Sequence, residues 1–238
     1  SGVVVDDALG VFLDRRSPAV SPLPAPGTCA LFRTPDALDQ QSALLPQLLG
    51  RWPDPTSGQG LDAGPRLTLS RGNQARALNP RSTGFYTRTR GGAGEPAFLE
   101  PGPLRLSTTG GKQVQPFVLT LQAPNRFQAQ LPPSGAVIDR AAGLTLKWTP
   151  ETMPPLVVAL VTAPDPQNRA LAACFCTAPA AAGALTMPAW LLLGLPPSTA
   201  AGLALTALPQ QPVHWSTQGL PNAAAASVYV ESNPIVLR

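Results

Sequence analysis

Apolar and polar residues alternate over short stretches along most of this chain, a pattern typical of β-strands. After residue 62, a phrase with Leu at positions i and i+2 follows a glycine-containing turn four times, at 64–69, 102–106, 143–146 and 202–205. Further alternating or apolar runs predict strands at 117–121, 127–131, 156–162, 170–176, 213–217 and 226–232. Because turn residues separate these runs at short intervals, the pattern predicts an all-β fold of sandwich-like sheets.

Helical periodicity is confined to two short stretches. Residues 35–50 carry Leu at helical spacing, but Pro46 interrupts them, and residues 187–197 resemble one helical turn with Pro188 suited to its first position. The chain has 30 Pro among 238 residues, which excludes long helices because an interior Pro removes a hydrogen bond and clashes with the preceding turn. We therefore expect short helical turns at most.

The same pattern suggests how the chain is divided. We expect an N-terminal strand at 1–14, a Pro-rich tether at 15–28, a first β module at 29–123 and a second β-sandwich module at 124–238. The seam falls near Ala123-Pro124-Asn125. The modules are predicted to be two Ig-like β-sandwiches with Pro-rich connections, or one extended sandwich.

The N-terminal strand has one largely apolar face. At period two, that face carries Val3, Val5, Leu9, Val11 and Leu13, with Asp7 as its only charge, and the other face carries Val4, Asp6, Ala8, Gly10, Phe12 and Asp14. A strand with an apolar face must join a sheet, either its own or that of another molecule. The 14-residue tether, extended as polyproline II, would span about 43 Å and reach an adjacent subunit. These five residues are the candidate plugs of an inter-subunit strand.

Charge is scarce in this chain and absent from one long region. Charged residues make up 13% of the chain, about half of the usual ~25%. From Ala170 to Val230 there is no Asp, Glu, Lys or Arg over 61 residues. Two sheets cannot bury both faces of every strand, so we expect part of this stretch to be surface. The stretch is interpreted either as a subunit interface, since it has no charged residue to repel a neighbouring subunit, or as the result of a genome whose codon composition favours Ala and Pro. The 17 basic residues are scattered, which argues against nucleic acid as a partner.

Residue patterns that carry catalysis are missing. The chain has no nucleophile elbow, no zinc-protease motif, no phosphate-binding loop and no dinucleotide-binding turn. The only histidine, His214, lies in a predicted strand, and the 13 acidic residues form no recognisable pair. Trp52, Trp148, Trp190 and Trp215 would stack on sugars only if exposed, and Trp in strands is more often core. We expect no enzyme activity, no cofactor and no metal site.

The three cysteines leave alternatives open. Cys174 and Cys176 point the same way from one predicted strand, about 6.5–7 Å apart, too far to bond without distortion. Either one could bond Cys29 and close a loop of roughly 145 residues. Three buried free thiols are the alternative. A disulfide between Cys29 and Cys176 would join the two expected modules.

Several motifs, taken in order, resemble a known group of proteins. They are PGTC at 26–29, LDAGPRLTLS at 61–70, FLEPGPLRLS at 98–107, GGKQVQPFVLTLQAP at 110–124, IDRAAGLTLKWTP at 138–150 and CTAPAAAGALTMPAWLLLGLP at 176–196. With this order and spacing, the chain resembles uncharacterised exported β-rich proteins of Acidobacteria, in the Solibacter and Bryobacter group. The resemblance implies a β protein exported through a cleaved signal peptide, and it favours Cys29 and Cys176 as the disulfide pair.

Two functional hypotheses remain. The first is an extracellular structural protein, a subunit of a surface fibre assembled head-to-tail with copies of itself by non-covalent β-strand contacts, including donor-strand exchange. The second is a monomeric secreted carbohydrate-binding or adhesin-like module, whose partner is a cell-surface or matrix polysaccharide. Both place the chain outside the cell or on its surface. No apolar run reaches the ~20 residues of a membrane helix, so neither includes a membrane span.

Overall fold

The structure is a computed structural model that describes residues 6–14, 24–34, 59–90, 98–125, 127–149, 156–164, 171–208 and 213–238. The chain divides into two compact units. Unit 1 comprises 1–19, 53–123 and 211–227, and unit 2 comprises 20–52, 124–210 and 228–238. Each unit therefore takes three separate segments of the chain.

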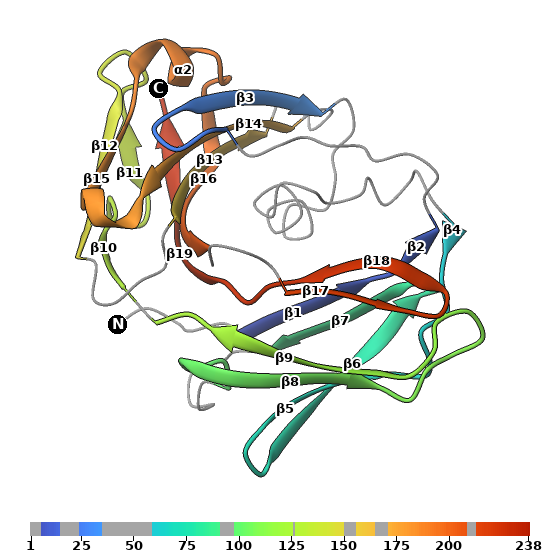
Figure 1. The fold of residues 1–238 in the computed structure, drawn as a ribbon. Coiled ribbons are helices and arrows are strands. Elements are labelled where there is room, and N and C mark those ends of the chain that lie inside the picture. The colour runs from blue at the N-terminus through green and yellow to red at the C-terminus, as the bar shows by residue number, and fades with distance from the viewer. Residues whose placement is uncertain are drawn as a thin grey trace. The chain divides into compact units, whose positions relative to one another are not determined.

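Unit 1 is built around a six-stranded antiparallel sheet in the order β1-β7-β6-β5-β8-β9 (Figure 1). Its strands are β1 (Asp6–Val11), β5 (Leu67–Arg71), β6 (Gln74–Ser82), β7 (Phe85–Arg90), β8 (Gly102–Thr108) and β9 (Phe117–Ala123). Two short pairs complete the unit: β2 (Leu13–Asp14) with β4 (Gln59–Gly60), and β17 (Val213–Thr217) with β18 (Leu220–Ala225). The hairpin β17–β18 adds Trp215, Leu220 and Ala225 to the core of this sheet.

Unit 2 packs one sheet on another. Its large sheet has the order β11-β19-β16-β13-β14-β3, and a three-stranded sheet has the order β10-β12-β15. The large sheet contains β3 (Cys29–Thr34), β11 (Ala136–Ile138), β13 (Leu156–Pro164), β14 (Leu171–Pro179), β16 (Ser198–Leu208) and β19 (Tyr229–Leu237). The small sheet contains β10 (Gln128–Gln130), β12 (Leu144–Thr149) and β15 (Ala184–Met187). Only β11 and β19 pair in parallel among the described strands.

Helix is limited to two short pieces within the described residues, the 3₁₀ turn η1 (Ala180–Ala182) and the α-helix α2 (Ala189–Leu193). Pro188 caps α2 rather than starting it, and its carbonyl oxygen accepts the N–H of Leu191 at 3.0 Å. The sequence-based prediction of an all-β, sandwich-like fold with short helical turns is confirmed. The helical pattern at 35–50 lies outside the described residues.

Alternation of apolar and polar residues explains why β9 and β12 form strands. Strand β9 has buried and exposed positions in strict alternation, and β12 repeats this pattern with Leu144, Leu146 and Trp148 buried. A side chain every second residue faces the core, because successive residues of a strand point to opposite faces of the sheet. Buried Trp148 also donates its indole N–H to the carbonyl oxygen of Ala180 at 2.7 Å.

The centre of the large sheet in unit 2 is buried on both faces. Val157, Ala159 and Val161 belong to the core shared with the small sheet, whereas the intervening Val158 and Leu160 belong to a second buried cluster. Strand β14 is buried at every position from 172 to 178. The expectation that part of the charge-free stretch at 170–230 is surface is confirmed, because Trp190, Leu193 and Val213 are exposed, although β14 within it is buried on both faces.

The two units do not match the contiguous modules expected at 29–123 and 124–238. The chain does pass from unit 1 to unit 2 at Ala123–Pro124, but the segment that holds Cys29 belongs to unit 2 and residues 211–227 belong to unit 1. Strand β3 joins unit 2 because it pairs with β14, far along the chain. Strand pairing between distant segments, rather than position along the sequence, decides where each segment belongs.

Candidate functional site: the docking position of the N-terminal segment

The described part of the predicted inter-subunit strand pairs within its own chain. Leu9 and Val11 lie in β1, which pairs with β7, with Leu9 opposite Thr87 and Val11 opposite Phe85. Leu13 lies in β2, opposite Gly60 of β4. Val3 and Val5 lie outside the described residues. The segment therefore forms an edge strand of the six-stranded sheet in unit 1.

The anchor of this segment is Phe12, which the sequence analysis placed on the opposite face. The regular strand is interrupted between β1 and β2, and Phe12 occupies the break with only 5% of its surface exposed. Its ring makes an edge contact with Tyr86, at 5.6 Å between centroids, and a tilted contact with Phe117, at 6.1 Å. Phe12 is an even-numbered position, so it lies outside the odd-numbered apolar face on which the period-two prediction relied.

Backbone hydrogen bonds hold Phe12 on both sides. Its N–H donates to the carbonyl oxygen of Gly84 at 2.8 Å, and its carbonyl oxygen accepts the N–H of Leu61, also at 2.8 Å. Gly84 has a φ of +81°, and a Cβ added there would overlap the Phe12 carbonyl oxygen. Only glycine therefore permits this close approach of the two backbones.

We call the residues that contact Phe12, namely Tyr86, Phe117, Gly84 and Leu61, its socket. A hydrogen-bonded network holds the loop at 61–64, to which Leu61 belongs. The buried Tyr86 hydroxyl donates to the Gly64 carbonyl oxygen at 2.7 Å and accepts the Ala63 N–H at 3.1 Å. Thr108 Oγ1 donates to the Ala63 carbonyl oxygen at 2.6 Å. Burial is the main cause that raises the pKa of Tyr86, so the phenol stays protonated and keeps its donor.

Asp62 ties the same loop to the segment at 110–114. Its carboxylate accepts the N–H of Gly64 at 2.8 Å and that of Lys112 at 3.3 Å, and its backbone carbonyl accepts Val114 N–H at 3.1 Å. The Gly64 hydrogen bond, followed by that of Lys112, lowers the pKa of the Asp62 carboxyl. None of these side-chain bonds involves residues 6–14.

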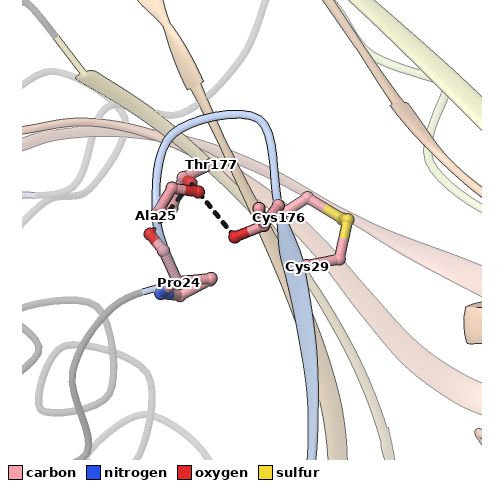
Figure 2. Close-up of a disulfide and its surroundings, with 6 residues drawn as sticks. Pro24, Ala25, Cys29, Cys176 and Thr177 are labelled. Atoms are coloured by element: carbon pink, nitrogen blue, oxygen red, sulfur yellow. Dashed lines mark hydrogen bonds between the residues drawn. A yellow bond between two sulfur atoms is a disulfide. The ribbon is translucent and has the colours of Figure 1, made fainter.

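The predicted disulfide between Cys29 and Cys176 is present, with an S–S distance of 2.00 Å (Figure 2). The two residues stand directly opposite each other on β3 and β14, with Cα atoms 4.0 Å apart. Beside them Thr177 Oγ1 donates to the Ala25 carbonyl oxygen at 2.8 Å and lies 3.1 Å from that of Pro24. Both cysteines belong to unit 2, so the expectation that this bond joins two modules was wrong.

Cys174 is a buried free thiol two residues before the disulfide. Burial raises its pKa to about 12, which keeps it protonated and unreactive. The third cysteine is therefore a core residue and not part of a redox pair.

The tryptophans fall into different environments. Trp148 is buried, Trp215 packs on Phe117 at 5.4 Å between ring centroids, and Trp190 is 68% exposed on α2. Trp52 lies outside the described residues, and the predicted strand residue His214 is exposed on β17. Only Trp190 is thus presented to solvent among the three described tryptophans.

Comparisons with known protein families, with curated proteins and with solved structures find no match to this chain. Within the described residues there is no group of three or more His, Cys, Asp or Glu side chains placed to hold a metal ion. No described helix is long and apolar enough to cross a membrane. The fold and the docked N-terminal segment are therefore the observations from which a function has to be argued.

Proposed function

We propose that this protein is an extracellular structural protein whose copies assemble by exchange of the N-terminal segment 6–14. In the closed form the segment docks on its own β7 and places Phe12 in its own socket. In the assembled form the same segment docks on the next copy. Exchange of one element between identical chains needs no new interface, because every contact of the closed form is reused.

The observation that carries this proposal is the socket. Its wall at 61–64 is held by Tyr86, Asp62 and Thr108 through bonds that do not include the segment. A strand-accepting subunit needs a site that keeps its form while it is empty. Burial of the Phe12 side chain contributes roughly 1.5–3 kcal/mol to docking, to which the ladder with β7 is added.

The Pro-rich tether that follows segment 6–14 favours exchange of the segment between copies over permanent docking in its own chain. Segment 6–14 is followed by a tether with Pro at 18, 22, 24 and 26, a composition that favours a stiff, extended chain. A stiff tether limits how freely the segment returns to its own socket. Since the contacts are the same within and between copies, tether stiffness and protein concentration set the balance.

The disulfide supports the location. Disulfides persist in oxidising surroundings such as the extracellular space and are rare in the cytosol. The Cys29–Cys176 bond therefore favours an exported protein, as the resemblance to exported β-rich proteins also implies.

Two measurements test the proposal. The first follows the size of the full chain with concentration, by light scattering and negative-stain imaging, for the natural protein and for Phe12→Ala. We expect concentration-dependent assemblies that Phe12→Ala reduces. A natural protein that stays monomeric at micromolar concentration would contradict strand exchange.

The second measurement separates docking from folding. A variant lacking residues 1–14, shown to be folded by hydrogen exchange in β5, β8 and β9, is titrated with a synthetic peptide of residues 1–14. We expect the natural peptide to bind, and a Phe12→Ala peptide to bind at least about tenfold more weakly, since ~1.4 kcal/mol corresponds to tenfold. A scrambled peptide is the control. Equal binding of all three peptides would remove the socket from the proposal.

A second function rests on one observation, the exposure of Trp190. An exposed Trp can stack on a sugar ring, and Leu193 on the same side of α2 is also exposed. A secreted carbohydrate-binding or adhesin-like module would use this position to bind a surface or matrix polysaccharide. Binding of neutral polysaccharides that Trp190→Ala abolishes, with Trp215→Phe as the control, would favour this function. No binding by the natural protein would reject it.

A further inference from the structure

Strand β9 forms an unprotected edge of the six-stranded sheet in unit 1. It pairs with β8 at all seven positions from Phe117 to Ala123 without a register shift, and no other described strand pairs with its outer side. Residues 117–123 contain no charged residue and no Pro. Native edge strands usually carry such features, or a bulge, because a regular row of unpaired N–H and C=O groups recruits another strand.

The other edges of the two six-stranded sheets are protected in these ways. Strand β1 carries Asp6 and Asp7, β3 carries Arg33, and β11 is only three residues long. Charge next to the ladder and short length both disfavour pairing with a further strand. Among the edges of the two six-stranded sheets, β9 alone combines length, regularity and absence of charge.

We propose that β9 pairs antiparallel with β9 of a second copy, about a two-fold axis through Thr120. In this register Thr120 lies opposite the partner's Thr120, and Val118 lies opposite the partner's Gln122. Thr–Thr pairs across strands are favourable, and the aliphatic part of Gln covers the Val side chain. Val118 is 57% exposed, so it has surface to bury in the pair, while Leu119 and Leu121 stay in the core of each copy.

The chain itself fixes this register. Pro116 precedes β9 and Pro124 follows it, and neither can donate a hydrogen bond to a ladder. With Thr120 on the axis, each Pro116 stands opposite a Pro124, just outside the paired region. A slip by two residues would bring a proline into the ladder. The two prolines therefore favour one register of seven residues.

The lack of charge on β9 also favours a second copy of this chain as the source of the strand that pairs with it. The neighbouring strand β8 carries one charged side chain, Arg105, opposite Thr120. In the pair, the two Arg105 residues are separated by three strand spacings, about 14 Å. This exceeds the Debye length of about 8 Å at physiological ionic strength, so their repulsion is screened. Strand β9 itself offers no charge for a basic or acidic strand to pair with, whereas an uncharged copy of the same strand needs none.

This interface is separate from the exchange of segment 6–14 and would join assembled rows side by side. It is tested by single cysteines in the full chain, crosslinked under mild oxidation. Thr120→Cys should give a disulfide-linked dimer at least about tenfold faster than Val118→Cys or Gln122→Cys alone, because a bound pair raises the effective concentration of facing groups. A mixture of the Val118→Cys and Gln122→Cys proteins should crosslink as Thr120→Cys does. Thr145→Cys, exposed on the central strand β12, measures random collision.

The outcomes separate this inference from strand exchange. Rapid crosslinking of Thr120→Cys that persists when Phe12→Ala is added supports the β9 pair whether or not exchange occurs. Crosslinking no faster than that of Thr145→Cys overturns the β9 pair and leaves strand exchange untouched. Rapid crosslinking of Val118→Cys alone would also overturn it, because the two Val118 residues are not opposite each other in this register.

Discussion

Removal of the Cys29–Cys176 disulfide is expected to destabilise unit 2 by several kcal/mol. The bond links residues 147 apart in sequence. For a closed loop of this length, the chain-entropy model assigns about 5 kcal/mol to the restriction of the unfolded chain. The double variant Cys29→Ser, Cys176→Ser loses this restriction and also places two hydroxyl groups at a buried edge of the core, so ~5 kcal/mol is the expected scale of the loss.

Hydrogen exchange under increasing urea, resolved by peptide, is the appropriate assay because it reports each unit separately. In the double variant, protection against hydrogen exchange should fall in β13, β14 and β16 of unit 2, while β5, β8 and β9 of unit 1 keep their protection. Cys174→Ala is the matched control, since it changes a neighbouring buried sulfur without opening the loop. It should cost on the order of 1 kcal/mol.

Two results would refute this reasoning. If the free energy of unfolding fell no more in the double variant than in Cys174→Ala, the closed loop would not stabilise the folded chain. An equal fall of protection in both units would mean that the bond does not act within unit 2 alone.

Three further predictions concern single side chains. Tyr86→Phe leaves the buried Ala63 N–H without its acceptor and the Gly64 carbonyl oxygen without its donor, so it should lower the free energy of unfolding by about 1–3 kcal/mol in urea titrations. Tyr229→Phe, which removes a hydroxyl that donates to the half-buried Glu231 carboxylate, should cost less. The pKa of Asp62 is lowered from its ordinary value of 3.8, so its carboxylate stabilises the folded chain at pH values above 3.8. This stabilisation is lost as the pH falls through the lower pKa of the folded state. The urea midpoint should therefore fall less between pH 5 and pH 3 in Asp62→Asn than in the natural protein. Cys174, whose pKa burial raises to about 12, should resist maleimide at pH 8 in the folded chain and react once the chain is unfolded in urea; labelling of the folded protein at the unfolded rate would show that the thiol is accessible.

The sequence predicted those elements whose burial follows a simple period. FVLTLQA and LTLKWT alternate between core and solvent, and both are strands where the pattern placed them. Strands β6 and β7 were missed because QARALNPRS and FYTRTR are mostly polar, and β6 buries only Leu78. A strand that contributes one side chain to the core leaves no periodic signal.

Pairings between distant segments were beyond the reach of pattern analysis. That β3 would pair with β14 follows from no local property of either strand, and only the resemblance pointed to Cys29 with Cys176. The socket residue Phe12 was assigned to the wrong face for a related reason, since its position depends on a break in the strand and on Gly84 of another segment. Local periodicity finds strands, whereas their partners are chosen by the whole chain.

The interleaving of three segments in each unit governs how this protein must be made. Strand β19 (Tyr229–Leu237) lies between β11 and β16, so the large sheet cannot be completed until these residues have been synthesised. Unit 1 likewise waits for its hairpin at 213–225. Until those residues have been made, the apolar strands synthesised earlier stay exposed, and folding is governed by slow, long-range pairing. A product lacking residues 228–238 would leave β16 as a bare edge, so this segment protects the nascent large sheet from aggregation.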